Sequence, residues 1–556
     1  MTESPALPTP ALPLPVLSVL TVGGDVVALR RTYRSLAEQT DRRWQWSVAL
    51  PGGDQPIPGV PLDPRVLVTD GPDEGPAGLA AALESATGEH VLRLAAGDLL
   101  SPETVEAVSE FLSPQGWGYT DEEQRFPSGR TPDVWEKPEY SPELLRSQPY
   151  AVRTAILPRA GLAAAGGIRP EAGSAAWYDA VLRVSEHAAP GVHVPSPLVV
   201  RTDPRLDERF VDGNPADAAR VVAGHCARVG IAVDSVETVT VLGRPVGQRL
   251  RRPLVRRPSV SIVVPTAGGT SVVRGRPRRH VVELARSLWV EGRYPDLELV
   301  VVHDAGTPPE VLAELVDIVG DDLVLCRYDD WFHFSRKCNR GAAVARGEYV
   351  CFLNDDMEIA DPAWLTEMVV HLEDPGVGAV GARLLFPDGT LQHIGHRYES
   401  GGAGHPLFGW WPTTLALGAA AHVTGERSGV TAACVLVRAT DFAHVGGFSE
   451  LFPLNYNDVD LCLKLREEGF RIIYTPHAEL VHFESQSRVP RILRSELALL
   501  ARRWSGRMVR DAYLRTSLPI QPRRVFVGGA VQGAGVPGTA AVPVPVASEL
   551  VEETHG

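Results

Sequence analysis

An acidic cluster follows an apolar run in the stretch Gly347-Glu-Tyr-Val-Cys-Phe-Leu-Asn-Asp-Asp-Met-Glu358. The run from Tyr349 to Leu353 is too short for a helix and suits a buried strand of a parallel sheet. In an open α/β sheet, ligands bind at the carboxyl ends of the strands, which is where Asn354, Asp355 and Asp356 would lie. Their hard oxygen atoms suit Mg²⁺ or Mn²⁺ carrying a diphosphate. The alternative is a solvated acidic turn without a ligand.

Three more acids and one histidine could serve the same chemistry. Asp304 follows a predicted strand and could accept hydrogen bonds from a nucleotide base or ribose. Asp458 and Asp460 open a predicted helix, whose N-terminal dipole favours carboxylates. His482 follows a short predicted strand, Arg471 to Tyr474. Taken singly, these residues could be a turn acid, helix caps and an ordinary buried or surface histidine. Their joint occurrence in order along one sheet favours a site.

Several rings in the same part of the chain have two interpretations. His393, His396 and His405 are predicted loop residues, with contact to an acceptor as the alternative. Trp410 and Trp411 fit either packing or a platform on which a sugar ring stacks.

Length, charge and cysteine usage limit the class of protein. A chain of 556 residues with 44% hydrophobic content is too long for one core and predicts at least two globular domains with tails. A net charge of -14 and a pI near 5.6 argue against a general nucleic-acid binder. Six cysteines without CxxC pairs indicate a reduced, intracellular protein. The N-terminus lacks an export signal, and no run reaches about 18 apolar residues. We therefore expect a cytoplasmic protein, at most peripheral at the inner face of the membrane.

Strand and helix patterns alternate in both halves of the chain, which predicts parallel sheets with crossover helices. The predicted strands are 17–22, 44–50, 91–94, 260–266 and 297–302, and the predicted helices are 26–39, 77–86, 178–186 and 281–288. The order restarts at Val260, so the halves are expected to be two copies of one α/β domain.

Direct alignment of the halves supports this repeat. Residues 88–98 align without a gap with residues 347–357, and residues 165–171 resemble residues 445–450. Residues 178–184 resemble residues 459–465 in the same way.

The first copy lacks the acids of the second. Ala95 and Gly97 occupy the positions of Asn354 and Asp356, and Trp177 occupies that of Asp458. Opposite His482 the first copy offers Val200 or Arg201, depending on one gap. We therefore expect the first copy to be catalytically inactive and to have a docking role, holding acceptor or stabilising the second copy.

These observations predict five segments. Residues 1–15 form a Pro-rich disordered tail, 16–240 the degenerate domain, 241–257 an Arg-rich linker, 258–525 the catalytic domain and 526–556 a low-complexity tail. Five arginines crowd the linker, at positions 249, 251, 252, 256 and 257. We interpret it as solvated, with contact to anionic lipid headgroups or a pyrophosphate-bearing partner as the alternative.

The motifs of the second half, taken together, resemble one known family. They are Ser261-Ile-Val-Val-Pro-Thr266, Phe334-Ser-Arg-Lys-Cys-Asn-Arg-Gly-Ala-Ala343, Ala345-Arg-Gly-Glu-Tyr-Val350, Phe352-Leu-Asn-Asp-Asp356, Gly446-Gly-Phe-Ser-Glu450, Asn457-Asp-Val-Asp-Leu-Cys-Leu463 and His482-Phe-Glu-Ser485. In this combination the chain resembles the inverting family-2 glycosyltransferases. Within that family it looks most like bacterial rhamnosyl- and galactofuranosyl-transferase relatives of cell-surface polysaccharide synthesis. The resemblance covers residues 257 to 515 and implies two tandem GT-A domains, α/β units with Rossmann-like, mostly parallel sheets.

The resemblance also implies roles for individual residues. Asp458 would be the general base, and Asp356 and His482 the ligands of a divalent metal, Mg²⁺ or Mn²⁺. The remaining residues would bind substrates: Thr266, Asp304, Asn339, Asn354 and Asp355 the nucleotide-sugar, and Trp410, Trp411 and Asp460 the acceptor. Asn354 replaces the first acid of the family's usual Asp-x-Asp, and Asn457 replaces a common Glu.

The expected function is inverting, metal-dependent transfer of a sugar from a nucleotide diphosphate donor, such as a dTDP- or UDP-sugar. The acceptor would be a hydroxyl of a glycan or lipid-linked glycan. The alternatives are a non-catalytic glycan-binding or scaffolding subunit and a nucleotidyltransferase. Release of nucleoside diphosphate indicates glycosyl transfer, whereas release of pyrophosphate indicates nucleotidyl transfer.

Overall fold

The computed structural model describes residues 14–53, 55–126, 132–202, 210, 213–273, 276–290, 293–483 and 493–515. The predicted tails, apart from residues 14 and 15, lie outside the described residues, as does the segment from Glu484 onward in the last family motif. Among the residues described, no helix has both the length and the apolar character needed to cross a membrane.

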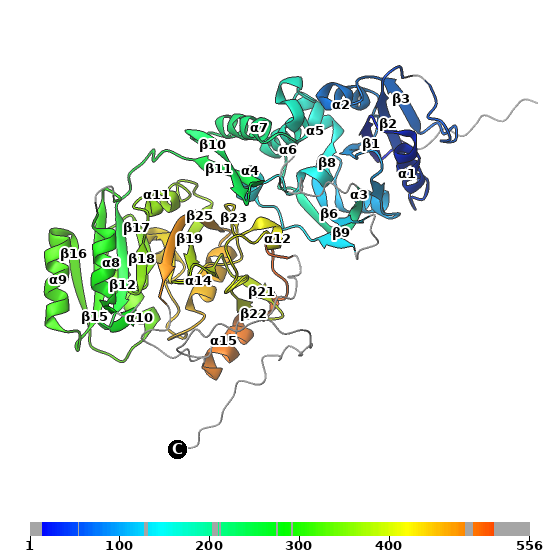
Figure 1. Ribbon diagram of the computed structural model, residues 1–556. Helices are drawn as coiled ribbons and strands as arrows, with labels where there is room; N and C mark the ends of the chain where they lie inside the picture. The colour runs from blue at the N-terminus through cyan, green and yellow to red at the C-terminus, as the bar shows by residue number, and fades with distance from the viewer. Residues whose placement is uncertain are drawn as a thin grey trace, which may run out of the picture. The chain divides into compact units, whose positions relative to one another are not determined.

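The first half contains one mixed sheet with helices around it (Figure 1). Its strands are β1 (Leu17–Val22), β2 (Trp44–Leu50), β3 (Val66–Asp70), β4 (His90–Arg93), β5 (Leu99–Leu100), β6 (Gly118–Gln124), β7 (Asp133–Trp135), β8 (Ala155–Pro158) and β9 (Val192–Arg201). Its helices are α1 (Val26–Ala37), α2 (Gly75–Glu84), α3 (Thr104–Phe111), α4 (Pro142–Ser147), α5 (Arg159–Ala164), α6 (Ala176–His187) and α7 (Pro215–Arg228). A hairpin of β10 (Ser235–Val241) and β11 (Arg244–Arg251) follows.

The second half contains another mixed sheet. Its strands are β12 (Val260–Thr266), β15 (Leu297–Asp304), β16 (Leu323–Tyr328), β17 (Tyr349–Leu353), β18 (Met357–Ile359), β19 (Val377–Leu385), β20 (Leu391–His393), β23 (Gly425–Glu426), β24 (Cys434–Arg438) and β25 (Arg471–His482). Its helices are α8 (His280–Leu288), α9 (Pro309–Val319), α10 (Phe334–Val344), α11 (Trp364–Val369), α12 (Ala416–Ala419), α13 (Ala439–His444), α14 (Asn457–Glu467) and α15 (Arg494–Trp504). Two small hairpins accompany it, β13 (Thr270–Val273) with β14 (Arg276–Arg279) and β21 (Arg397–Glu399) with β22 (Gly402–Gly404).

The two sheets have the same strand order. The first runs β3-β2-β1-β4-β8-β6-β9-β5 and the second β16-β15-β12-β17-β24-β19-β25-β18, so each strand has a counterpart at the same place. In each sheet the first four strands are parallel, and antiparallel pairs begin where β4 meets β8 and β17 meets β24. The predicted α/β class with two tandem units is confirmed.

A shared hydrogen bond fixes the register in both copies. Gly88 donates its backbone N–H to Ser18 Oγ at 2.9 Å, and Gly347 donates to Ser261 Oγ at 2.8 Å. A side chain on either glycine would meet the backbone of the neighbouring strand at 2.7 Å or less, so the close approach requires glycine. The aligned segments 88–98 and 347–357 therefore lie at the same place in their sheets.

The second sheet is buried on both faces. Ile262 of β12 packs with Val281 of α8 and Leu315 of α9, whereas Val263 packs on the other face with Cys338 of α10. Burial on two faces explains why these strands are continuous apolar runs without alternation.

The first copy carries an arginine at the place of His482. In the second sheet Met357 pairs with His482, and in the first Leu99 pairs with Val200. Since Asp98 aligns with Met357 and directly precedes Leu99, the same antiparallel register puts Asp98 opposite Arg201. These two side chains form an ion pair at 3.2 Å. The gap left open by the sequence is thereby resolved in favour of Arg201, a fixed cation where the second copy has an imidazole.

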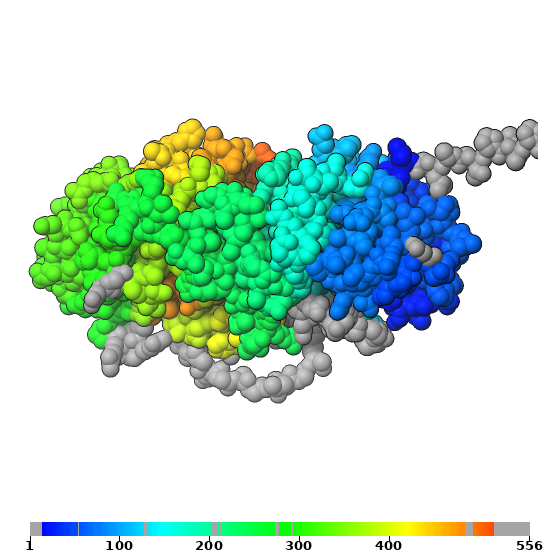
Figure 2. Space-filling view, turned by 90° about the horizontal axis from the view of Figure 1, so that it is seen from above, coloured from blue at the N-terminus to red at the C-terminus, as the bar shows by residue number. Residues whose placement is uncertain are grey.

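The Arg-rich segment is not the solvated linker that the sequence predicted. Residues 244–251 form β11, and two of its arginines, Arg249 and Arg251, pair with acids of both halves. Arg252, a nearly buried side chain, lies 3.0 Å from Glu143 of α4, and Arg249 lies 2.7 Å from Glu367 of α11. In the space-filling view of Figure 2 the green surface of this region adjoins both the cyan and the yellow-green parts. Four of the five arginines thus pair with carboxylates, whereas Arg256 and Arg257 keep exposed side chains.

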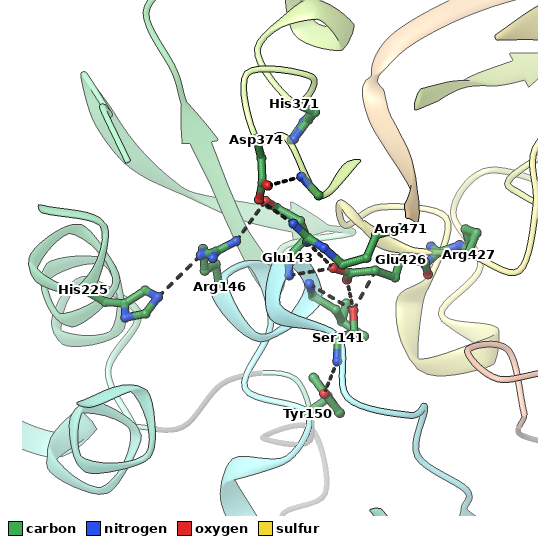
Figure 3. Close-up of polar contacts among 12 residues, drawn as sticks. Ser141, Glu143, Arg146, Tyr150, His225, His371, Asp374, Glu426, Arg427 and Arg471 are labelled. Atoms are coloured by element: carbon green, nitrogen blue, oxygen red, sulfur yellow. Dashed lines mark hydrogen bonds and ion pairs between the residues drawn. The ribbon is translucent and has the colours of Figure 1, made fainter. Parts of the chain in front are cut away.

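A buried polar network joins the same elements (Figure 3). Glu426 of β23 is fully buried and accepts hydrogen bonds from Ser141 Oγ and, at 3.3 Å, from the Glu143 backbone N–H. It also pairs with Arg471 Nη1 at 2.9 Å. Burial disfavours the charge on Glu143, but the guanidinium groups of Arg252 and Arg146 outweigh it and lower the pKa of this carboxyl. The halves are thus connected by paired charges that have little access to water.

His371, beside Arg252, should make stability sensitive to acid. Burial and the Arg252 guanidinium lower the pKa of His371 to about 3. Because the unfolded histidine takes up a proton near pH 6.5, stability is lost as pH falls from about 6.5 towards 3, by about 2 kcal/mol at pH 5. The free energy of unfolding in urea should fall less between pH 7.5 and pH 5 in His371→Gln than in the unchanged chain, and the difference should equal this amount. Equal pH dependence of the variant and the unchanged chain would contradict the assignment.

Candidate active site

A cleft of about 600 Å³ opens at the carboxyl ends of β12 and β17. The predicted site residues that line it are Thr266, Asn354, Asp355, Asp356, Asp458 and His482. They come from four different elements or turns, and the sheet edge is what brings them together.

Asp356 and His482 form the most specific pair in the cleft. His482 Nε2 lies 3.0 Å from Asp356 Oδ1, and Asn354 Nδ2 lies 3.3 Å from the same nitrogen. Both side chains are buried, because the β18–β25 pairing brings the strand end of His482 alongside the acidic turn. Burial disfavours the charge on Asp356, but His482 outweighs it and lowers the pKa of the carboxyl.

The residues present fit a divalent metal. Gln392 Oε1 accepts a hydrogen bond from His482 Nδ1 at 2.7 Å, which leaves the lone pair of Nε2 facing the carboxylate. Two ligands at right angles on an ion with bonds of about 2.1 Å lie about 3.0 Å apart, which matches this pair. A ligating histidine held by a second residue at its other nitrogen is the usual arrangement at metal sites.

Asp355 is bound to the first strand of the sheet. Thr266 Oγ1 donates a hydrogen bond to Asp355 Oδ2 at 2.6 Å. Burial and the adjacent Asp356 carboxylate raise the pKa of Asp355 to about 7. Two neighbouring carboxylates in one buried turn are costly without a cation, which is a second indication that the turn is built to hold one.

Asp304 lies at the end of β15 and pairs with a lysine that the sequence analysis did not single out. Lys337 of α10 is fully buried, and its Nζ lies 2.6 Å from Asp304 Oδ1 and 2.7 Å from the Thr266 carbonyl oxygen. Its ammonium group also lies 5.3 Å from the centre of the Phe332 ring, which lines the cleft. Asp304 keeps about a third of its side chain exposed, so one oxygen remains open to a ligand.

Asp458 lies in the first turn of α14 and faces the cleft. The residue before the helix, Tyr456, has a left-handed backbone with φ of 60°, an uncommon conformation for a bulky residue and one found at functional sites. Asp458 Oδ1 accepts the Val459 N–H at 2.8 Å and Oδ2 the Ala432 N–H at 3.2 Å. These two donors fix the carboxylate in one orientation while it stays accessible from the cleft.

Two predicted contacts are corrected by the structure. Both ends of the Asn339 amide are bonded to the backbone of Phe448 at 2.9 Å, so Asn339 fixes the Gly-Gly turn and does not reach the cleft. Asp460 is fully buried, accepts the Trp504 indole N–H at 2.9 Å and pairs with Lys464 at 3.6 Å. The pair Asp179–Arg183 occupies the same place in the first copy, so this acid stabilises the fold in both halves.

The two tryptophans that were interpreted as packing residues or as a sugar platform lie outside the cleft. Trp410 packs beside Leu391 and Ile394, and Trp411 is 57% exposed, but neither lines the cleft. Phe408 does line it, at 46% exposure, with its ring centre 4.8 Å from that of Phe386.

His280 and Gln392 are further cleft residues that the sequence analysis missed. His280 begins α8 and is buried, and neither of its ring nitrogens has a hydrogen-bond partner among the described residues. The helical period of residues 281–288 identified this helix, but nothing in one sequence distinguishes its first residue from a surface histidine. Gln392 belongs to a three-residue strand without a pattern of its own.

Parts of the chain are similar in sequence to known proteins. Residues 278–445 match the sequence model described as Glycosyl transferase family 2. The matched residues belong to the second half, from α8 to α13, and include the acidic turn of Asp356.

Among individual proteins, the chain is 32% identical over 499 residues to the O-antigen biosynthesis protein RfbC of Myxococcus xanthus, covering 85% of this chain and 38% of that protein. It is 29% identical over 547 residues to the uncharacterized protein y4gI of Sinorhizobium fredii, covering 92% and 58% respectively. The chain thus spans between about two fifths and three fifths of the length of these relatives.

A third relative matches a shorter stretch. The N-acetylglucosaminyl-diphospho-decaprenol L-rhamnosyltransferase of Mycobacterium tuberculosis is 32% identical over 121 residues, 20% of this chain and 39% of that protein. Among solved structures, a mannosyltransferase of Pyrobaculum calidifontis in complex with GDP-Man and Mn²⁺ is 17% identical with a TM-score of 0.31, over 45% of this chain and 70% of that one.

Proposed function

We propose that the chain transfers a sugar, with inversion, from a nucleoside diphosphate donor to a hydroxyl of a glycan or lipid-linked glycan in polysaccharide synthesis. The proposal rests on the presence of two kinds of group in one cleft, a pair of potential metal ligands and a potential general base. Asp356 and His482 offer metal ligands 3.0 Å apart, and Asp458 presents a fixed carboxylate in the same cleft.

The residues divide between donor and acceptor chemistry. Asp304 accepts hydrogen bonds from the nucleoside, with Lys337 and Thr266 fixing its orientation. When bound at Asp356 and His482, a divalent cation neutralises the charge that develops on the leaving diphosphate. Asp458 accepts the proton of the attacking hydroxyl, and its two backbone hydrogen bonds hold it ready. A dTDP- or UDP-sugar is the donor that we propose, following the family resemblance.

The test is product identity with the full chain. Incubation with dTDP- and UDP-sugars, an acceptor glycan and Mg²⁺ or Mn²⁺ should release nucleoside diphosphate, and chelation of the metal should stop the reaction. Release of pyrophosphate, or no release with any donor of a broad panel, would contradict the proposal.

For the first half we propose a non-catalytic, supporting role. Arg201 and Asp98 neutralise each other where the second copy has His482 and the acidic turn, and the first half offers Ser141 and Glu143 to the buried Glu426. These contacts favour stabilisation of the second half as the role. A segment of residues 257–530 that was soluble and as active as the full chain would refute it.

Gln392 should tune metal affinity without touching the metal. Gln392→Ala removes the acceptor of His482 Nδ1–H and is expected to weaken Mn²⁺ binding about 10- to 100-fold. Titration with Mn²⁺ in the presence of UDP measures this directly. Gln392→Glu keeps an oxygen at that position and is the matched control, with affinity close to that of the unchanged chain. Unaltered Mn²⁺ affinity in Gln392→Ala would contradict the assignment of His482 as a metal ligand.

A further inference from the structure

A second, smaller cavity of about 270 Å³ adjoins the cleft on the side of Asp458. Asp458, Asn457 and His405 line both spaces, so a ligand in the second cavity reaches the carboxylate proposed as the base. Pockets for drug-sized ligands enclose about 300–1,000 Å³, so this one suits a single small ring.

The charge of the cavity is informative. Its lining, drawn entirely from described residues, contains no lysine or arginine, and Asp458 is its one carboxylate. A ligand carrying a carboxylate or phosphate in this cavity would face Asp458 without a compensating cation. The cavity therefore favours an uncharged ligand.

The cavity also presents unused hydrogen-bonding groups. The Asn457 side chain is buried, and its Nδ2 has no hydrogen-bond partner among the described residues. Nδ1 of the buried His396 also has no hydrogen-bond partner among the described residues. Nε2 of the same ring lies 3.7 Å from Asp458 Oδ2. Unsatisfied buried polar atoms are costly unless a ligand or water pairs with them. Residues with unpaired polar atoms in the wall of a cavity suit a ligand rich in hydroxyl groups.

A chain of hydrogen bonds fixes which nitrogen of His405 carries its proton. The Thr431 backbone N–H donates to His393 Nε2 at 3.1 Å, so neutral His393 carries its proton on Nδ1. His393 Nδ1 lies 2.9 Å from His405 Nδ1 and donates to it. His405 therefore keeps its own proton on Nε2, as a donor at the junction of the two spaces.

The same chain of bonds argues against a metal at these histidines. Nitrogens of His393, His396 and His405 lie within 4.8 Å of one another, close enough for a metal cluster. However, the proton that His393 Nδ1 donates to His405 Nδ1 lies between the two nitrogens that would have to bind the ion. The Thr431 N–H bond to His393 Nε2 prevents this proton from moving to the other nitrogen of His393.

We propose that the second cavity binds the uncharged sugar ring that carries the accepting hydroxyl, with His405 Nε2–H as a hydrogen-bond donor to that ring. The inference rests on the proposed glycosyl transfer and adds the acceptor class, a neutral sugar rather than a uronic acid or a phosphorylated sugar. Any charged part of a larger acceptor lies outside this cavity.

Gly404 offers a way to fill the cavity without strain. A Cβ at Gly404 would meet no atom within 4 Å, and its φ lies outside the left-handed region, so the backbone accepts a larger side chain. Gly404→Phe should occupy the cavity. Gly402→Phe is the matched control, because Gly402 belongs to the same strand, β22, tolerates a Cβ and does not line the cavity.

Saturation-transfer NMR on the full chain tests the proposal with methyl glycosides of neutral hexoses and of glucuronic acid as probes. Neutral glycosides should give signals that Gly404→Phe reduces at least fivefold and Gly402→Phe leaves unchanged, and the uronate should give none. His405→Phe should weaken the binding of the neutral glycosides about five- to tenfold, which is the effect of losing one hydrogen bond. Thermal shifts with UDP or dTDP and Mg²⁺ should be the same in all four proteins, which also shows that the variants are folded.

Three results would overturn the inference: no signal from any neutral glycoside, equal signals in Gly404→Phe and Gly402→Phe, or stronger binding of the uronate. A chain that binds neither UDP nor dTDP contradicts the proposed function instead. The two failures are therefore distinguishable.

Discussion

Replacing Asp458 with asparagine is expected to lower the rate of sugar transfer by about a hundred- to ten-thousandfold, the usual effect of losing a general base. The amide cannot take up the proton of the attacking hydroxyl. Nucleotide binding should persist, because Asp304, Asp356 and His482 are unchanged. The measurements are initial rates of nucleoside diphosphate release and calorimetric binding of UDP or dTDP with Mg²⁺.

The control for this variant lies on the same helix. Glu467→Gln changes a half-exposed carboxylate at the far end of α14 and should keep full activity. Asp458→Asn also loses one backbone hydrogen bond, since only one of its two acceptor oxygens remains, so its melting temperature must be recorded beside its rate. Transfer at nearly the original rate in a folded Asp458→Asn protein would refute the assignment of the base.

The second large effect concerns stability. Glu143→Gln leaves the Arg252 guanidinium buried without its partner carboxylate, and breaking a buried pair in this way costs on the order of 3–5 kcal/mol. The free energy of unfolding in urea, followed by circular dichroism at pH 7.5, should fall by this amount. The loss is expected to affect both halves, because Glu143 belongs to α4 and Arg252 directly follows the β10–β11 hairpin.

A surface pair of the same hairpin provides the comparison. Glu237 lies 3.1 Å from Arg251, and both side chains are substantially exposed. Glu237→Gln should cost less than about 1 kcal/mol, as exposed ion pairs usually do. Equal losses in Glu143→Gln and Glu237→Gln would mean that the network of Figure 3 does not contribute through its burial.

Much of the fold was predictable because hydrophobic period and turn residues determine it locally. The predicted strands at Leu17–Val22, Trp44–Leu50 and Val260–Thr266 have the observed bounds, and the helix expected to open with Asp458 and Asp460 is α14. The β10–β11 hairpin was missed because its arginines resemble a solvated segment. Glu367, the acidic partner of Arg249, is 118 residues away in the sequence, so no local pattern reveals that pairing.

The site was predictable to the extent that strand ends locate it. Asp356 and Asp458 follow or open strongly patterned elements, and the structure places both in one cleft. Asp460 was misassigned although it is two residues from Asp458, and residues two apart on a helix do not face the same way. With Asp458 towards the cleft, Asp460 must point into the core. Gln392 and Lys337 act through hydrogen bonds to residues distant in sequence, which one sequence cannot show.

The duplicated strand order also has a consequence for how the chain reaches its native state. β1 and β12 occupy equivalent positions in their sheets, and each accepts the same hydrogen bond from a glycine N–H to a serine hydroxyl. Each strand could therefore pair at the position of the other. During synthesis the first sheet can close before the second is available, whereas dilution from denaturant releases both together. Sheets in which a strand of one copy pairs with strands of the other are then a kinetic trap, as in other repeat proteins. The yield of native protein on refolding from denaturant would be lower than the yield from synthesis in the cell.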